Sequence, residues 1–372
     1  MKLWKAILAL LPIILIAAMF LLHGIKIHSY EGVASLLVFL YVVYLFFMML
    51  RTGKTWKYRA MLFIPAALLF PISFIYHNII TRGSMMVSSV AVYECKVPFC
   101  HLVTPMLIIP GFAIGEIPFP GTMSGGFASI ASMLVIIISA VIVLGRGWCS
   151  WGCFYGGWDE GVAQLRKKPS FVFKSKLWRL LPWAVLAFSA LLSAYTLAPA
   201  YCEWLCPFKA VTEFKIGSTV VDIIGMLLFF GMFLIFIIIL PFRSKKRAQC
   251  SFFCPLGPTL LALSNRVNIF SIKIAKDKCI KCKKCITVCP LNAIDEEGLQ
   301  QGTIRSECAK CGRCADNCPT KAIAYHIRGT GCNANSAAAR LLFMYAAYIL
   351  MVAMLGTMLA KSISVIFKLA LG

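Results

Sequence analysis

Long apolar runs separated by short polar loops dominate the sequence of 372 residues. An α-helix needs about 20 mostly apolar residues to cross the hydrocarbon core of a bilayer, and runs of this length recur along the chain. The pattern therefore predicts a polytopic α-helical membrane protein with about seven spans. We expect these spans at residues 6–22, 33–50, 60–80, 127–144, 180–198, 219–242 and 340–367.

The first apolar run has a second interpretation. Residues 6–22 follow a short basic start, as the apolar centre of a cleavable signal peptide would. The residues that come next read HGIKIHSYEG and contain no cleavage pattern of the A-x-A kind. We therefore expect a retained membrane helix.

Composition and charge agree with a membrane location. The chain is 60% hydrophobic and 14% charged, with a mean hydropathy of +0.84. The net charge of +23 does not indicate nucleic-acid binding, because the cations lie in loops that flank apolar runs. Loops 51–59, 145–179 and 243–247 hold fifteen lysines and arginines, whereas the intervening loops hold five. This bias predicts an inner (cytoplasmic) membrane protein whose basic loops face the cytoplasm.

Two cysteine runs lie between the sixth and seventh predicted spans. They read CIKCKKCITVCP from residue 279 and CAKCGRCADNCP from residue 308. Each is C-x2-C-x2-C-x3-C-P, the bacterial ferredoxin pattern for two [4Fe–4S] clusters, in which the fourth cysteine of each run ligates the other cluster. The expected ligand sets are Cys279, Cys282, Cys285 and Cys318 for one cluster, and Cys308, Cys311, Cys314 and Cys289 for the second.

Zinc or disulfides explain these runs less well. Structural zinc sites take four ligands in two pairs, not four in a run with the run doubled. We expect residues 269–328 to form a small α+β ferredoxin-like domain in the cytoplasm. It would lie between a membrane domain of residues 1–268 and a C-terminal span within residues 329–372.

Four further cysteine pairs lie outside these runs. The predicted topology puts Cys149/Cys153 and Cys250/Cys254 on the inner side, and Cys95/Cys100 and Cys202/Cys206 on the outer side. Three of the pairs are C-x3-C, and residues four apart on a helix share a face, so both sulfurs can point at one object. Four thiols are the ligand complement of one iron–sulfur cluster. The sequence predicts a third cluster at the inner four cysteines and a fourth at the outer four.

Other chemistry stays open for both sets. The inner thiols also suit a thiol–disulfide or transient metal relay, or are plain cysteines at the membrane interface. The outer thiols also suit one or two disulfides, because the outside of many cells is oxidising, or copper or zinc. Cys332 stands apart and is expected to be a lone thiol. Haem is not indicated, because no histidine pair at helical spacing lies within the spans and C-x-x-C-H is absent from the sequence.

A family resemblance follows from these motifs. GRGWCSWGC after one span, QCSFFCPLGP before the insert and the two ferredoxin runs resemble the NapH, NosR and MauN family of ferredoxin-type membrane proteins, over residues 127–328. Members look like partners that pass quinol electrons to or from extracytoplasmic redox enzymes, or that assist their maturation. The resemblance carries over Cys149, Cys153, Cys250 and Cys254 as the two cytoplasm-facing C-x3-C-P motifs, with Phe154 in place of the first proline.

The expected function is membrane electron transfer. The protein would relay electrons between a cytoplasmic ferredoxin-like partner, its own clusters, and a quinone or extracytoplasmic oxidoreductase. The alternative is an accessory protein that delivers metal or reducing equivalents to a partner metalloenzyme. We expect a subunit of an oxidoreductase system rather than a stand-alone enzyme, with lipid and redox proteins as partners and no nucleic acid.

Overall fold

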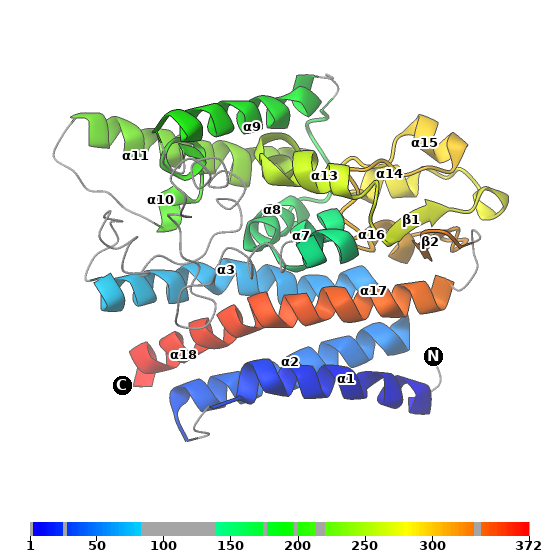
Figure 1. Cartoon of the computed structure of the whole chain (residues 1–372), viewed down its shortest axis with the longest axis horizontal. Helices are drawn as coiled ribbons and strands as arrows, with labels where there is room; N and C mark the ends of the chain where they lie inside the picture. The colour runs from blue at the N-terminus through cyan, green and yellow to red at the C-terminus, as the bar shows by residue number, and fades with distance from the viewer. Residues whose placement is uncertain are drawn as a thin grey trace. The chain divides into compact units, whose positions relative to one another are not determined.

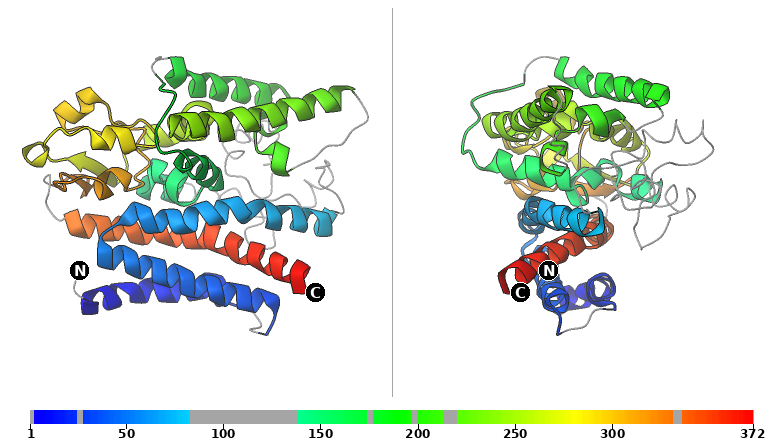
Figure 2. Two further views of the ribbon diagram at one scale, coloured as in Figure 1. Left: turned by 180° about the vertical axis from the view of Figure 1, so that it is seen from behind. Right: turned by 90° about the vertical axis from the view of Figure 1, so that its left-hand side faces the viewer.

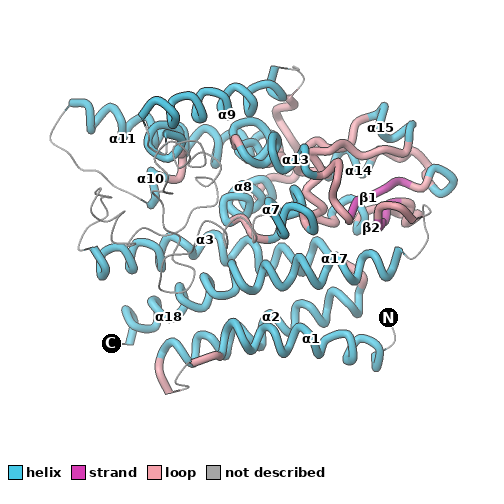
Figure 3. The backbone as a smooth tube through the Cα atoms, in the orientation of Figure 1, coloured by secondary structure: helices cyan, strands magenta, loops and turns pink. Residues whose placement is uncertain are grey.

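The computed structural model describes residues 3–24, 28–82, 138–173, 177–196, 200–212, 220–330 and 336–371. In this part of the chain regular structure is almost entirely helical, and β1 and β2 are its strands (Figure 3). The chain forms two compact units. Unit 1 comprises Met1–Ser73, Ala140–Gly161 and Leu261–Gly372, and unit 2 comprises Phe74–Ser139 and Val162–Leu260.

Among the described residues, six helices are long and apolar enough to cross a membrane. They are Trp4–Leu22, Tyr30–Thr52, Thr55–Tyr76, Leu177–Thr196, Ile223–Ser244 and Ser336–Leu371. Each coincides with a predicted span, so the multi-helix architecture is confirmed for these segments. Of the remaining predicted span, at residues 127–144, the structure describes only residues 138–144, and 127–137 lie outside the described residues.

The long helices of unit 1 run alongside one another (Figures 1 and 2). They are α1 (Leu3–Leu22), α2 (Tyr30–Thr52), α3 (Thr55–Arg82) up to Ser73, and a rod made of α17 (Ser336–Met351), η7 (Val352–Gly356) and α18 (Thr357–Leu371). The Tyr348 hydroxyl of α17 donates to the Val42 carbonyl of α2 at 2.6 Å. On the outer face of α1, Leu15 is 72% exposed, as an apolar side chain in contact with lipid would be.

The insert folds around one short antiparallel sheet. Strand β1 (Phe270–Ile274) pairs with β2 (Ile323–Ile327), with Phe270 opposite Ile327. Between the strands lie four short helices, namely η6 (Lys276–Lys278), α14 (Lys284–Val288), α15 (Glu296–Gln301) and α16 (Arg313–Asp316). Phe343 of α17 packs on the sheet, with its ring centroid 5.1 Å from that of Tyr325 and 5.7 Å from that of Phe270. The insert is therefore built onto a membrane-length helix of its own unit.

Unit 2 is organised around α9 (Leu177–Thr196). Its other elements are η2 (Tyr201–Leu205), α10 (Lys209–Thr212), the run of α11 (Val220–Phe233), η3 (Leu234–Ile239) and α12 (Leu240–Ser244), and two π-helical turns, η4 (Gln249–Phe253) and η5 (Leu256–Leu260). Helix α9 buries a stripe at Pro182, Val185, Ser189 and Ser193, and it packs against η4 and η5. The Ser193 hydroxyl accepts a hydrogen bond from the Ala200 amide at 3.1 Å, which ties the residue before η2 to α9.

The insert also caps a membrane-length helix. The Asp316 carboxylate accepts from the amides of Thr55 and Trp56, at 3.0 and 2.7 Å. These are the first two residues of α3, whose amides have no partner within the helix. A carboxylate at this position also complements the positive end of the helix dipole. Asp316 thus acts as an N-cap supplied from a distant part of the sequence.

This cap gives a stability prediction. Replacing Asp316 with alanine should cost about 1–2 kcal/mol, the usual loss for an N-cap. It should lower the thermal unfolding midpoint of the purified protein in detergent. The control is Asp277→Ala, since Asp277 also lies two residues before a cysteine but is exposed. Equal shifts for the two variants would contradict the capping role.

Candidate metal centres

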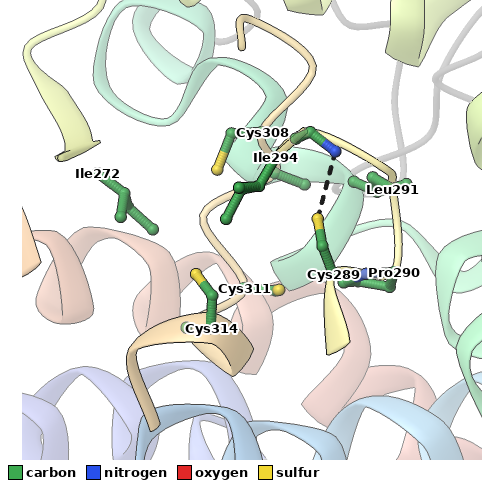
Figure 4. Close-up of a pocket in the computed structure, with 11 residues that line it drawn as sticks. Ile272, Cys289, Pro290, Leu291, Ile294, Cys308, Cys311 and Cys314 are labelled. Carbon is green, nitrogen blue, oxygen red and sulfur yellow. Dashed lines mark hydrogen bonds between the residues drawn. The ribbon is translucent and has the colours of Figure 1, made fainter. Parts of the chain in front are cut away.

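The eight cysteines of the insert line two cavities. One is lined by Cys279, Cys282, Cys285 and Cys318, and is called the first cavity. The other is lined by Cys308, Cys311, Cys314 and Cys289, and is called the second cavity. Figure 4 shows the four sulfur atoms of the second cavity turned toward a shared centre. Each cavity takes three cysteines from one run and the fourth from the other run.

The two runs repeat one backbone conformation. Residues at matching positions have left-handed φ angles: Lys281 (54°) matches Lys310 (49°), Lys283 (59°) matches Gly312 (80°), and Asn292 (51°) matches Lys321 (53°). The amides of Ala293 and Ala322 donate to the sulfurs of Cys289 and Cys318, both at 3.3 Å. Hydrogen bonds to sulfur favour the thiolate over the thiol. The sequence repeat is therefore also a structural repeat that presents sulfur inward.

The lining of the second cavity suits a sulfur-ligated cluster. Apart from its four cysteines, the lining residues are glycine, proline, alanine, leucine and isoleucine. Burial raises the pKa of the Cys308 thiol to about 12 and that of Cys314 well above the usual value. Only a bound cation makes thiolates favourable in such a place, because coordination deprotonates a thiol outright. At Cys318 burial acts the same way, but hydrogen bonds from Thr320, Ala322 and Ile323 outweigh it and lower the pKa.

The second cavity is fixed to the segment that contains Cys149. This segment consists of η1 (Gly145–Gly147) and α7 (Trp148–Trp151), and both pack within unit 1. The Trp151 indole donates to the Lys310 carbonyl at 3.2 Å, and the Arg146 guanidinium donates to the Glu307 carbonyl at 2.5 Å. The Lys310 ammonium donates a hydrogen bond to the Leu144 carbonyl at 2.8 Å. The run from Cys308 therefore lies directly against the chain that leads into the Cys149/Cys153 pair.

The Lys310 ammonium is unusually enclosed for a lysine. The residue is 3% exposed, and its ammonium also donates to Asn265 Oδ1 at 2.7 Å. Asn265 in turn donates to the carbonyls of Ser306 and Cys308. Burial lowers the pKa of Lys310 to about 8, against the opposing effect of Cys308. This small polar network anchors the second cysteine run by its side chains and its backbone.

The first cavity has the opposite character. Cys282 is exposed, and Ile280 beside it is 63% exposed. The lysines around it at positions 276, 278, 281, 283 and 284 are all exposed. The two cavities of the repeat therefore differ, since one is held against the helices of unit 1 and the other is open to solvent.

Two of the C-x3-C pairs close with the same hydrogen bond. The amide of Cys153 donates to the Trp148 carbonyl at 3.1 Å, and that of Cys254 donates to the Gln249 carbonyl at 2.8 Å. Both bonds span five residues, as in a π-helix. Cys202 lies in the π-helical turn η2, with Cys206 directly after it. The Gly257 amide also donates to the Cys254 sulfur at 3.4 Å, like the amides in the insert.

Within unit 2 the structure brings two of these pairs together. Gln249, directly before Cys250, donates from Nε2 to the hydroxyl of Tyr201, directly before Cys202, at 3.1 Å. Both residues are buried. Burial raises the pKa of Tyr201, and the nearby thiols of Cys206, Cys254 and Cys202 raise it further.

This placement differs from the expectation that Cys202/Cys206 and Cys250/Cys254 lie on opposite sides of the membrane. The reason is that both elements are held by α9, since Ser193 of α9 accepts from the Ala200 amide directly before η2, and α9 packs against η4. Loop charge carries no information about such contacts. Cys95, Cys100 and Cys332 lie outside the described residues, so the predicted outer set is not visible as a whole.

Comparison with protein-family models agrees with this arrangement of cysteines. Residues 271–319 match a 4Fe–4S dicluster domain. Residues 126–171, 180–218 and 224–274 match a 4Fe–4S binding domain, and each of these segments contains one C-x3-C pair.

Curated relatives point the same way. An uncharacterized protein of Methanocaldococcus jannaschii is 30% identical over 48% of this chain and 73% of its own length. The methylamine utilization ferredoxin-type protein MauN of Methylobacillus flagellatus is 26% identical over 46% of this chain and 57% of its own. The ferredoxin-type protein NapH of Haemophilus influenzae is 23% identical over 50% and 59%. The chain belongs to the ferredoxin-type membrane proteins. No solved structure matches it.

Membership in the ferredoxin-type membrane proteins confirms the resemblance seen in the sequence. It also confirms the general prediction of a 4Fe–4S electron-transport protein of the membrane. Several site residues went unnoticed in the sequence, namely Arg146, Trp151, Lys310, Tyr201 and Gln249. One signal was available, because Arg146 and Arg247 both stand three residues before a C-S-x-x-C and both are buried.

The contact between Tyr201 and Gln249 gives the second prediction. Tyr201→Phe and Gln249→Leu should each lower the unfolding midpoint, because each leaves a buried polar partner unsatisfied at a cost of about 1–3 kcal/mol. The double variant should lose less than the sum of the two, which a double-mutant cycle by thermal unfolding measures. Tyr195→Phe is the control, since Tyr195 is 87% exposed. Strict additivity would show that the two side chains do not interact.

Proposed function

We propose that the insert of this ferredoxin-type membrane protein holds two [4Fe–4S] clusters, one in each cavity. The ligands would be Cys279, Cys282, Cys285 and Cys318 in the first cavity, and Cys308, Cys311, Cys314 and Cys289 in the second. The shared lining of each cavity by both runs supports this assignment. The amide donors at Cys289 and Cys318 support it as well, since such bonds favour thiolate. Bound clusters would supply one-electron storage at both positions.

The second cavity is the point at which the insert exchanges electrons with the membrane part. The observation that carries this proposal is the set of direct bonds from Arg146, Trp151 and Lys310. They join the run that begins at Cys308 to the chain on both sides of Cys149. The first cavity has no comparable attachment to the membrane helices among the described residues, and its rim is exposed. The order along the path is then first cavity, second cavity, Cys149/Cys153 turn.

Further centres would be held by the remaining pairs. A third would use Cys149, Cys153, Cys250 and Cys254, and a fourth would use Cys95, Cys100, Cys202 and Cys206. The match of the C-x3-C segments to a 4Fe–4S binding domain supports iron–sulfur chemistry there. The contact between Tyr201 and Gln249 supports electron exchange between two of the pairs. It equally supports one centre shared by Cys202, Cys206, Cys250 and Cys254.

The far end of the path would be a quinone or an extracytoplasmic redox protein. The cation bias supports a cytoplasmic insert and a location in the inner membrane. The membrane-length helices support contact with lipid, and the ferredoxin-type names of MauN and NapH support redox partners. The function that follows is one-electron relay between a cytoplasmic partner and a membrane or extracytoplasmic one.

Iron and acid-labile sulfide in anaerobically purified protein test this function. The proposal predicts about 12 to 16 iron atoms per chain, because each four-cysteine set would hold about four. About 8 would mean that only the insert is loaded and would contradict a relay into the membrane part. That result would instead favour an accessory role for the C-x3-C pairs. Fewer than about 8 would contradict the cluster assignment in the insert itself.

The allocation of the C-x3-C cysteines makes a separate prediction. If Cys149/Cys153 and Cys250/Cys254 share one centre, serine at both positions of either pair should remove about four iron atoms, and the two losses should not add. If Cys202/Cys206 share a centre with Cys250/Cys254, that pairing should be non-additive instead. Cys332→Ser is the matched control and should leave the iron content unchanged.

A further inference from the structure

The two halves of the insert use their cations in different ways. Lys310 of the second run is buried and bonded to Leu144 and Asn265, whereas its counterpart Lys281 in the first run is exposed. Arg313 of the second run stacks over the Trp56 ring, with its guanidinium carbon 4.5 Å from the ring centroid. Its counterpart Lys284 is exposed. The cations of the second half thus contact other parts of the chain, whereas the equivalent cations of the first half are exposed to solvent.

The exposed cations form a compact surface around the first cavity. Lys281, Lys283 and Lys284 line the cavity together with Ile280 and Cys282. Lys276 and Lys278 precede the first cysteine by one to three residues, and Lys321 lies beside the fourth ligand position at Cys318. The exposed acidic residues close to these lysines in the sequence or by ion pair are Asp277 and the first two residues of α15, Glu296 and Glu297. One of these, Glu296, pairs with Lys283 at 2.7 Å, and both side chains are more than half exposed.

Positive charge therefore exceeds negative charge around a partly apolar centre. Ile280 is 63% exposed in the middle of this surface, next to the exposed Cys282. Docking sites between proteins commonly join a small apolar core to a charged rim. Charge of one sign on the rim steers a partner of the opposite sign and raises the association rate by about 10- to 1,000-fold.

We propose that the lysine rim of the first cavity is the docking surface for an acidic one-electron carrier protein of the ferredoxin or flavodoxin kind. This inference rests on the proposed function, since it takes the first cavity to hold a cluster. In the docked pair one electron passes between the carrier and the centre in the first cavity. One partner is oxidised by one electron and the other reduced by one, and no bond forms or breaks. The exposed Cys282 and Ile280 mark the point of closest approach.

The test compares charge reversals at the rim with matched reversals elsewhere. The rim variant is Lys278→Glu with Lys284→Glu, each directly before a cysteine and each outside the left-handed region. The control is Lys273→Glu with Lys168→Glu, which are exposed and carry the same change in charge. Lys273 lies on the face of β1 opposite to Ile272, which lines the second cavity. Iron content is measured first on every variant.

The measurement is the second-order rate constant for reduction of the oxidised full-length protein by reduced flavodoxin, in nanodiscs of neutral lipid and at several salt concentrations. We expect the rate constant of the rim variant to be at most about one tenth of the wild-type value, with a flatter salt dependence. The control should react like the wild type. Reduction by a small viologen should be equal in all three. Oxidation of the reduced protein by a basic cytochrome c should be faster in the rim variant.

Three results would overturn the proposal in distinguishable ways. If the rim variant and the wild type react with flavodoxin at equal rates and both hold about 8 or more iron atoms per chain, the docking proposal is contradicted. The proposed function is then unaffected. If rates are equal in neutral nanodiscs and diverge only with anionic lipid, the lysines serve a lipid surface and not a carrier. Iron well below about 8 in the wild type would end both proposals.

Discussion

A buried lysine holds the soluble insert to the membrane-length part of unit 1. The Lys310 ammonium reaches the Leu144 carbonyl, and its backbone carbonyl accepts from both Trp151 and Tyr325. Burying an ammonium is costly unless its donors are satisfied, so this residue is tolerated only where the partner carbonyl and Asn265 are in place. Lys310 lies between Cys308 and Cys311, so the residue that joins the insert to this part of unit 1 also belongs to the cysteine run of the second cavity.

This attachment, together with the other contacts to unit 1, gives the two halves of the repeat different surroundings. The two cysteine runs share their spacing, their left-handed residues and their amide-to-sulfur bonds. They differ in what surrounds them, because the second run is bonded to α7 and to the start of α3, whereas the lysines of the first run are exposed. The two cavities therefore differ in access, since Cys282 of the first cavity is exposed and Cys311 and Cys314 of the second are buried. The asymmetry thus lies in the environment of the sites and not in the ligands.

Sequence alone carried the local chemistry but not the tertiary arrangement. Ligand-type spacing grouped the eight insert cysteines as the two cavities now group them, because both runs obey one repeat. Hydropathy located the membrane-length helices, because a run of about twenty apolar residues is typical of a helix that crosses a bilayer. The bond from the Ala200 amide to Ser193 and the contact of Tyr201 with Gln249 could not be predicted, since they depend on single polar side chains. Loop charge separated Cys202/Cys206 from Cys250/Cys254, whereas these contacts bring the two pairs together.

We propose that electrons pass from the first cavity through the second cavity to the cysteines of the C-x3-C pairs. Rapid-freeze EPR tests it most directly, after oxidised protein is mixed with less than one equivalent of reduced flavodoxin. The account predicts that ferredoxin-type signals appear first and a signal from a further centre follows. In the double variant Cys311→Ser/Cys314→Ser the further centre should stay oxidised. The signal of the first cavity in this variant checks that the insert has folded. Reduction of the further centre at the wild-type rate in that variant, or its absence from the wild type, would contradict the account.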